Sequence, residues 1–225
     1  MDKISIIIPT LNEAENISMN LAYLSEIAGD AELIVADANS SDNTIGAVGK
    51  MAQVIFSKRG RGAQMNAGAK VACGDVLWFI HADCRPHPES VPAMFAALKD
   101  QNIAGGAFEY NLNHKGLFYR LVEFNSNLKN HIFKKIFGDM GIFVRKTVFL
   151  KMNGFKDIPL MEDVDFCRRL KKMGNIVILP QQIETSARRW EQEGLLYNLV
   201  RNWILQIAYM WGVSPDTLSK WYHFR

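Results

Sequence analysis

The chain lacks any apolar run long enough to cross a bilayer. A spanning helix needs about 20 consecutive apolar residues, and the longest runs here are much shorter. Charge of one sign is not in large excess either, because the formal net charge is +3 with no long basic run, which argues against nucleic acid as a partner. Residues 4–9, ISIIIP, are too short for the apolar core of a signal peptide and are better interpreted as a first strand. We therefore expect a cytoplasmic protein, or one bound peripherally at the inner face of the membrane.

Cysteine is also scarce, with only Cys73, Cys84 and Cys167 in the chain. An odd number of cysteines without metal-ligand spacing favours reduced thiols over a disulfide framework. The apolar share of 48% and the charged share of 22% are those of an ordinary globular protein, which excludes a disordered chain. A length of 225 residues suits one domain, or two fused halves, with a substantial core.

Strand and helix patterns alternate through the first hundred residues. The predicted strands are 4–8, 32–36, 54–56 and 76–80. Asn12 and Glu15 form a candidate cap for a helix after the first strand, and residues 39–42 form one for a short helix after the second. Pro86 and Pro88 are expected to open a further helix. This order with short links predicts a mixed, mostly parallel sheet flanked by helices.

The pattern changes after residue 105. We expect strands at 107–112, 142–145 and 176–179, and helices at 118–137, 162–172 and 195–211. No internal repeat or low-complexity linker divides the chain. We therefore expect a single domain with three parts, residues 1–104, 105–190 and a carboxyl-terminal helical extension, 191–225.

Acidic residues recur where predicted elements begin or end. Asp37 and Asp83 follow buried strands, and Glu162 and Asp163 open a helix. The carboxyl edge of an open α/β sheet is where ligands bind, so these acids indicate a site for a cation or a diphosphate. Asp83 is the stronger candidate and can ligate Mg²⁺ or Mn²⁺, and the alternative is an acid at a strand end that caps the turn toward Pro86. A zinc site from His81 and its neighbours is disfavoured, because the ligands share one tight turn.

Two further features have ordinary structural explanations. Gly60-Arg61-Gly62 can cradle phosphate with arginine donors, but it matches neither the Walker pattern nor the dinucleotide fingerprint. A solvated turn explains it as well. Glu162, Asp163 and Asp165 can simply favour the positive end of a helix dipole. The chain lacks a good nucleophile arrangement, however, and this cluster can supply a base.

Four motifs together resemble family 2 glycosyltransferases in their order and spacing. They are Pro9-Thr10-Leu11-Asn12-Glu13, Asp37-Ala38-Asn39-Ser40-Ser41-Asp42-Asn43-Thr44, residues 62–68 leading to His81-Ala82-Asp83, and Glu162-Asp163. The resemblance covers about residues 4–190 and implies the GT-A fold and inversion of the anomeric centre of a nucleotide sugar. Shorter strings resemble a small bacterial subgroup labelled selenodomain-associated or arsenosugar-type transferases. These are 138–141, 161–163 and Ser186-Ala187-Arg188-Arg189-Trp190.

The resemblance implies a role for each matching position on the donor side. Residues 1–104 would form the half that binds the nucleotide sugar. Pro9 and Glu13 would line the nucleotide pocket, and Asp37 would accept a hydrogen bond from the base, typically uracil. Arg61 and Asn66 would lie near the nucleotide and its phosphates.

The catalytic roles follow in the same way, with residues 105–190 as the acceptor and catalytic half. Asp83 would hold Mg²⁺ or Mn²⁺ at the position of the Asp-x-Asp motif, with His81 as a possible second ligand. Asp163 would be the general base with Glu162 beside it. Arg188, Arg189 and Trp190 would lie near the acceptor and the diphosphate.

Three departures from the family pattern leave alternatives open. His81 replaces the first acid of Asp-x-Asp, Ala38 replaces the second acid of the usual pair, and Ser186 replaces a glutamine. A nucleotidyltransferase is one alternative, but it favours a lysine-bearing glycine-rich loop after the first strand. A catalytically inactive binding protein is another, although the retained Glu162-Asp163 pair argues against it. The donor sugar, the acceptor and the oligomeric state have no signature.

The last predicted helix carries an apolar stripe. Its members are Leu196, Leu199, Trp203, Ile207 and Trp211. We expect this stripe to pack on the catalytic domain or on a second copy of the chain, in preference to a lipid surface. Arg201, Lys220 and Arg225, with the aromatic residues around them, keep contact with a membrane surface as an alternative.

Overall fold

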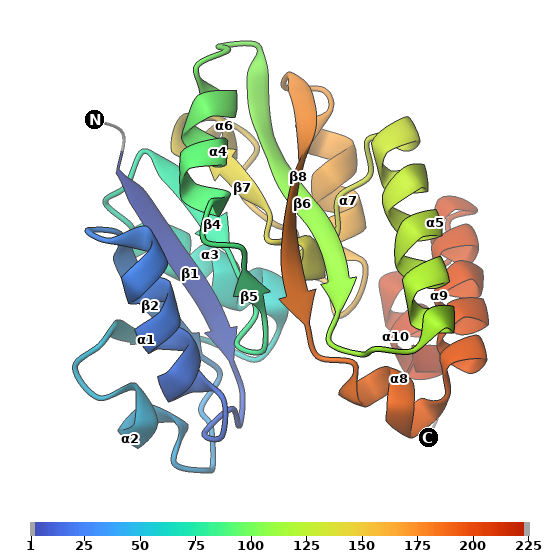
Figure 1. The fold of residues 1–225 in the computed structure, drawn as a ribbon, viewed down its shortest axis with the longest axis horizontal. Helices are drawn as coiled ribbons and strands as arrows, with labels where there is room; N and C mark the ends of the chain where they lie inside the picture. The colour runs from blue at the N-terminus through green and yellow to red at the C-terminus, as the bar shows by residue number, and fades with distance from the viewer. Residues whose placement is uncertain (1–2, 223–225) are drawn as a thin grey trace.

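The computed structural model describes residues 3–222, apart from the side chains of residues 188 and 189. In this part of the chain, eight strands form one sheet in the order β3-β2-β1-β4-β7-β6-β8-β5 (Figure 1). The strands are β1 (Ile4–Thr10), β2 (Glu32–Asp37), β3 (Gln53–Phe56), β4 (Val76–Phe79), β5 (Arg85–Pro86), β6 (Ile103–Leu112), β7 (Phe143–Arg145) and β8 (Asn175–Thr185).

Strand directions divide the sheet at β7. The pairs β1–β2, β1–β4, β2–β3 and β6–β8 are parallel, whereas β7 runs antiparallel to both β4 and β6, and β5 antiparallel to β8. The predicted mixed, mostly parallel sheet is therefore confirmed. The carboxyl ends of β1, β2 and β4 meet at one edge, as the positions of Asp37 and Asp83 suggested.

Helices cover both faces of the sheet and extend it at one end (Figure 1). They are α1 (Ile17–Ala28), α2 (Thr44–Val48), α3 (Arg61–Val71), α4 (Ser90–Leu98), α5 (Leu117–Phe133), α6 (Lys146–Lys151), α7 (Glu162–Leu170), α8 (Arg188–Glu193), α9 (Leu195–Met210) and α10 (Pro215–Tyr222), with a 3₁₀ turn η1 at Gly138–Met140. Helices α5, α9 and α10 gather at the end remote from α1 and α2.

Alternating side chains of the central strands supply two separate cores. Ile6 and Ile8 pack with α1 and α4, whereas Ile7 between them packs on the opposite face with α3, α6 and α7. This follows from the period of two in a strand that is covered on both faces. Gly68 brings α3 close to the sheet, because a Cβ there would lie only 2.4 Å from Cγ2 of Ile7. Helix α3 therefore packs directly against β1 at this position.

Three predicted boundaries are wrong. Helix α1 begins at Ile17 with Asn16 before it, and Asn12 does not cap it, because the Asn12 carboxamide instead accepts from Ser41 N–H. Pro86 lies in the edge strand β5 and does not open a helix, since β5 pairs with β8 and α4 begins only at Ser90. Helix α5 ends at Phe133, four residues before the predicted end, where Lys134 adopts a left-handed conformation.

Tertiary contacts also define elements that the sequence pattern did not reveal. Helices α6, α8 and α10 were not predicted, and β8 continues six residues beyond the predicted end at residue 179. A buried cluster of Met161, Leu205 and Leu218 joins α9 and α10 to the start of α7. No helix within the described residues is long and apolar enough to span a membrane.

Candidate active site

Four carboxylates from distant segments meet beyond the carboxyl end of β4. Asp83 follows β4, Asp139 lies in η1, and Glu162 and Asp163 form the first turn of α7. They interact electrostatically: burial, followed by the charges of Asp163 and Asp83, raises the pKa of Asp139 to about 6 against the opposing effect of Arg61. The predicted grouping of Asp83 with Glu162 and Asp163 is therefore present in the structure.

Gly138 is the point at which these segments come together. Its N–H donates to Oδ2 of Asp163 at 3.0 Å. A Cβ added at Gly138 would lie 3.2 Å from Nε2 of His81 and 3.7 Å from Oδ2 of Asp163. The turn that carries His81 and Asp83 therefore lies beside the carboxylate of Asp163, and only a residue without a side chain fits comfortably between them.

The two acids at the start of α7, Glu162 and Asp163, differ in their exposure to solvent. Met161, which precedes the helix, has φ of +70°, a conformation that costs energy for a residue with a long side chain. The buried contacts of Met161 with Leu205 and Leu218 hold it in place. Glu162 is then buried and Asp163 half-buried, so of the two it is Asp163 that a substrate can more readily reach.

The site carries more negative than positive charge. Burial, and then the charge of Asp163, raise the pKa of Glu162 to about 7, while Arg61 lowers it. Removal from water alone would lower the pKa of Arg61, but the charges of Glu162, Tyr222, Asp163 and Asp139 raise it. Among the described side chains, the Arg61 guanidinium interacts with three carboxylates and with Tyr222, and an added cation would relieve the mutual repulsion of the acids.

The residues around Asp83 fit a hard cation. The ligand atoms of His81, Asp83 and Cys84 lie within 4.8 Å of one another. Burial, followed by the charges of Asp83 and Asp139, raises the pKa of the Cys84 thiol well above its usual range, so the sulfur remains protonated and is a poor ligand. Carboxylate oxygens with one imidazole remain, which suits Mg²⁺ or Mn²⁺ better than a thiolate-bound zinc.

Asp37, at the end of β2, is in a different environment. It is 0% exposed, and its carboxylate accepts from the Thr10 hydroxyl at 2.9 Å and from the Ser40 hydroxyl and N–H at 2.6 and 2.7 Å. These three donors satisfy it within the protein. In this structure Asp37 therefore holds the turn after β2 against the end of β1.

The turns after β1 and β2 are fastened to each other by side chains. Asn12 accepts from Ser41 N–H at 2.8 Å, Glu13 N–H donates to the Thr44 hydroxyl at 2.8 Å, and Asp42 accepts from Thr44 N–H at 3.0 Å. This network explains why the family-like strings 9–13 and 37–44 contain so many short polar residues. Pro9, half-buried in β1, lies opposite Ala36 at the same edge of the sheet.

Two residues predicted near the phosphates have different surroundings. Arg61 is the first residue of α3 and reaches the acid cluster. The Asn66 carboxamide forms a double hydrogen bond with Phe155, donating to its carbonyl at 2.8 Å and accepting from its N–H at 2.9 Å. Gly62 packs directly against the backbone of the loop that contains Phe155 and Lys156, since a Cβ at Gly62 would lie 2.5 Å from the Lys156 carbonyl oxygen. Asn66 thus positions the loop after α6.

The third acid of the α7 cluster is structural. Asp165 is 0% exposed and forms ion pairs with Lys156 at 2.9 Å and with Arg169 at 2.5 Å. Desolvation raises its pKa, but hydrogen bonds and charge from these two cations outweigh it and lower the pKa overall. Asp165 therefore anchors α7, while the acids at the start of the helix face the site.

The predicted acceptor residues are described only in part. Trp190 is half-buried in α8 and packs against the core on the α3 side of the sheet. The side chains of Arg188 and Arg189 lie outside the described residues, so their predicted role stays a prediction.

Two residues of the site were not predicted. Asp139 lies in the string 138–141, which matched the subgroup but had no role assigned, and its position in a single 3₁₀ turn gives no periodic signal. Tyr222 interacts with Arg61 and reaches the site only because α10 folds back on α7. Its proximity depends on tertiary packing that spacing along the sequence does not encode.

The sequence matches known proteins over most of its length. Residues 5–158 match the family described as Glycosyl transferase family 2. The chain is 25% identical over 224 residues to the probable glycosyltransferase YdaM of Bacillus subtilis, covering 86% of this chain and 51% of that protein. It is 32% identical over 119 residues to a dolichol-phosphate mannosyltransferase of Pyrococcus furiosus, covering 47% and 33%. The chain thus spans about half or less of the length of these curated relatives.

Solved structures share the fold. Glucosyl-3-phosphoglycerate synthase from Mycobacterium tuberculosis, solved with Mn²⁺, UDP and glucosyl-3-phosphoglycerate, has a TM-score of 0.58 at 22% identity, covering 80% of this chain and 70% of that chain. S. aureus TarS in complex with UDP-GlcNAc has a TM-score of 0.63 at 18% identity, covering 82% and 58%. At such identities the likeness establishes the fold alone, and it confirms the predicted GT-A architecture.

Proposed function

The chain belongs to glycosyl transferase family 2, and from that premise we propose that it transfers a sugar from a nucleotide-diphosphate sugar to an acceptor hydroxyl with inversion of the anomeric carbon. The observation that carries the proposal is the convergence of Asp139, Glu162 and Asp163 around Arg61, with Asp83 beside Asp139. Such a cluster needs a cation, and a site with a cation and an arginine suits a diphosphate leaving group.

Asp163 is the proposed general base. An alcohol is a poor nucleophile at neutral pH, so a carboxylate must take its proton as the oxygen attacks the anomeric carbon. Asp163 is half-buried, and the hydrogen bond from Gly138 N–H fixes its Oδ2. Glu162, which is buried, acts beside it by holding Arg61. The new bond forms between the acceptor oxygen and the anomeric carbon while the bond from that carbon to the diphosphate breaks.

The departing diphosphate needs positive charge. Asp83 would hold Mg²⁺ or Mn²⁺, with Asp139 close by and His81 as a further donor. A bound cation would neutralise the negative charge that gathers on the diphosphate. Arg61 stands at the amino terminus of the eleven-residue helix α3, where it can donate two hydrogen bonds to a phosphate. Asn66 is not proposed to contact a phosphate, because both hydrogen-bonding groups of its carboxamide are engaged by the Phe155 backbone.

The nucleotide would lie over the ends of β1 and β2. Pro9 and Glu13 border this edge, and Asp37 positions the turn through Ser40. A UDP-type donor is our proposal, and it agrees with the nucleotides in the two solved relatives of the same fold. Direct acceptance by Asp37 from a base would require one of its three present hydrogen bonds to rearrange.

Finer assignments also belong to the proposal. Residues 1–104 would bind the donor, 105–190 would supply the catalytic and acceptor side, and 191–225 would form a helical extension within one domain. We propose membership of the selenodomain-associated or arsenosugar-type subgroup from the strings 138–141, 161–163 and 186–190. The position of Asp139 in the acid cluster gives the first string a chemical role in this proposal. A cytoplasmic enzyme, peripheral at the membrane, agrees with the absence of a spanning helix in residues 3–222.

A thermal-shift panel tests this proposal. The full-length protein is heated with UDP, GDP and dTDP sugars, each with and without Mn²⁺. We expect UDP sugars to raise the melting temperature only when Mn²⁺ is present, followed by release of UDP when an acceptor is added. Stabilisation by a nucleoside triphosphate with release of pyrophosphate would instead identify a nucleotidyltransferase. An inactive binding protein would bind the nucleotide sugar in the presence of metal but turn over no acceptor, and its affinity for the nucleotide sugar would be the same in Asp163→Asn.

A further inference from the structure

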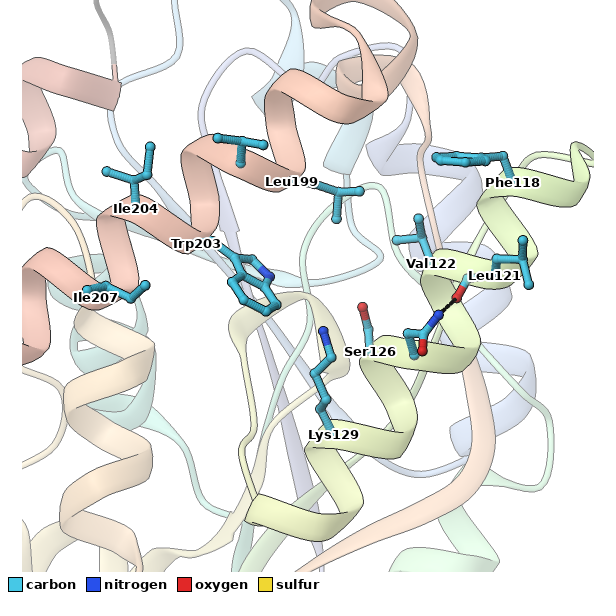
Figure 2. A pocket seen from close by; sticks show the side chains of 11 residues that line it. Phe118, Leu121, Val122, Ser126, Lys129, Leu199, Trp203, Ile204 and Ile207 are labelled. Carbon is cyan, nitrogen blue, oxygen red and sulfur yellow. Dashed lines mark hydrogen bonds between the residues drawn. The ribbon is translucent and has the colours of Figure 1, made fainter.

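Helices α5 and α9 form an apolar face that the proposed chemistry does not use. A groove of about 630 Å³ lies between them. Figure 2 shows Phe118, Leu121 and Val122 of α5 on one side of it and Leu199, Trp203 and Ile207 of α9 on the other. The side chains across the groove belong to the carboxyl-terminal stripe that was expected to pack on the catalytic domain.

Most of the stripe does not pack on the rest of the chain, which was one of the two expected partners, and packing on a second copy stays a prediction. Leu196, Trp203 and Trp211 are 69%, 56% and 86% exposed, and the side chains of α9 that are buried include Asn198 and Leu205 on the other side of the helix. Large apolar side chains at such exposure are unusual on a protein surface unless they contact a partner or a membrane.

Helix α5 continues the same apolar surface. The residues of its outer stripe recur every three or four positions and are all about half exposed or more: Leu117, Leu121, Phe124, Leu128 and Ile132. The exposed apolar side chains of the two helices thus form a broad apolar surface, and Figure 1 shows both helices at one end of the molecule. We call this surface, made by the exposed apolar residues of α5 and α9, the α5–α9 face.

The exposed charged side chains on α5 and α9 themselves are positive, whereas Glu191 and Glu193, which precede α9, pair with His114 and Arg201. Lys129 lies over the Trp203 ring at 4.5 Å, and Lys134 and Lys135 directly follow α5. Glu123 is the one carboxylate on the two helices; it is buried and paired with Arg120 at 2.7 Å. The exposed part of the face therefore offers cations, tryptophan and aliphatic side chains, and no acid.

We propose that the α5–α9 face docks on the surface of an anionic lipid bilayer. Lysines among apolar and tryptophan side chains complement anionic head groups above acyl chains. A symmetric dimer through this face would instead bring the lysines of the two copies together, and neither α5 nor α9 carries an exposed carboxylate to pair them. Helix α5 has 17 residues and α9 has 16, so each spans about 25 Å, less than the ~30 Å hydrocarbon core, and lies along the interface.

Docking in this way would hold the acid cluster near the lipid surface. Asn130 of α5 donates to Sδ of Met140, the residue after Asp139, at 3.4 Å. On the other wall of the groove, Leu205 of α9 packs on Met161, the residue before Glu162. An acceptor presented at the bilayer would therefore lie near the site. This consequence rests on the proposed function, but the docking itself is independent of it.

Vesicle co-sedimentation tests the docking without donor or acceptor. The full-length protein is mixed with phosphatidylcholine vesicles, with or without phosphatidylglycerol, at low and high salt. We expect binding to the anionic vesicles, weakened by salt, and little binding to phosphatidylcholine alone. Trp211→Ser and Leu121→Ser should each lower the partition coefficient about tenfold, and Lys129→Gln about fivefold.

Leu150→Ser is the matched control. Leu150 is 57% exposed on α6 and Leu121 is 51% exposed on α5, so the same change is made at similar exposure on a different surface. Binding should be unchanged in Leu150→Ser and also in Asp163→Asn, which separates docking from catalysis. Absence of binding to anionic vesicles, equal loss in Leu150→Ser, or a dimer in analytical ultracentrifugation that Leu121→Ser dissociates would each overturn the proposal.

Discussion

Buried carboxylates occur in two contrasting environments in this molecule. Asp37 and Asp165 are both 0% exposed, and each has its charge satisfied by donors or cations of the protein. Glu162 and Asp139 lie among other acids, and burial, followed by the charge of Asp163, raises their pKa values to about 7 and about 6. The two environments lie close together, because Asp165 and Glu162 belong to the same helix.

The difference distinguishes structural from functional acids better than burial does. A carboxylate with enough donors stabilises the fold and needs nothing from outside. Carboxylates that repel one another destabilise the folded state unless a ligand supplies positive charge, so their persistence is best explained by function. The satisfied acids should therefore control stability, and the crowded acids should control binding and turnover.

The largest effect is expected from Asp163→Asn. The amide can still accept from Gly138 N–H but cannot take a proton from the acceptor, so kcat should fall about 10²- to 10⁴-fold. Affinity for the nucleotide should stay nearly the same, which calorimetry can check. A variant that bound nucleotide poorly and yet turned over normally would show that the base lies elsewhere.

Asp165→Asn, two residues further along α7, should lower the stability of the protein and leave turnover nearly unchanged. Removing its charge leaves Lys156 and Arg169 without their partner and should destabilise the protein by about 3–5 kcal/mol, measured by urea unfolding. Turnover per folded molecule should remain close to that of the wild type at low temperature. If the stability stayed unchanged while kcat collapsed, the division between the two environments would be wrong.

Asp139→Asn should weaken the response to metal. One carboxylate fewer near the cation should raise the Mn²⁺ concentration needed for half-maximal stabilisation by UDP about 10- to 100-fold. Thermal shift at fixed UDP measures this directly. Asp216→Asn, at the first turn of α10, serves as a control of equal charge change and should leave the Mn²⁺ requirement unaltered.

The smallest effect is a dependence of stability on pH. Because the folded-state pKa of Glu162 is raised to about 7, the protonated form stabilises the fold at low pH, and this contribution is lost as pH rises from about 4.5 through about 7. In Glu162→Gln, the decline of the free energy of unfolding with rising pH should be smaller by an amount on the order of 2 kcal/mol. Melting temperatures of the two proteins should therefore coincide near pH 5, separate as the pH rises towards 7 and differ by a constant amount at higher pH, and a parallel pH profile would contradict the assignment.

The sequence predicted those parts of the site that lie at the ends of regular elements. Asp83 follows an apolar run, and Glu162 and Asp163 open an amphipathic helix, so hydrophobic periodicity located them before any tertiary contact was known. The strand positions of the first half followed for the same reason. Hydrogen-bond satisfaction is a tertiary property, and it decided that Asp165 is structural.

The features that were missed depend on contacts between distant segments. Asp139 sits in one 3₁₀ turn without periodicity, and Tyr222 reaches Arg61 only through the packing of α10. Pro86 was assigned to a helix start because proline is common there, but it occupies an edge strand, where its missing N–H is tolerated. The apolar stripe on α9 is likewise exposed because of a tertiary contact: Leu205 packs on Met161 and Leu218, so the side of α9 that carries Leu205 is buried and the stripe on the opposite side faces outward.

Calorimetric titration of UDP into the protein, with and without Mn²⁺, tests the central claim that the crowded carboxylates hold a cation for a diphosphate. Performed near pH 6.5 in buffers of different ionisation enthalpy, it also counts protons. We predict that UDP binds tightly only with Mn²⁺ and that protons leave Glu162 and Asp139 when both are bound. Equal affinity without metal, together with no proton release, would contradict it.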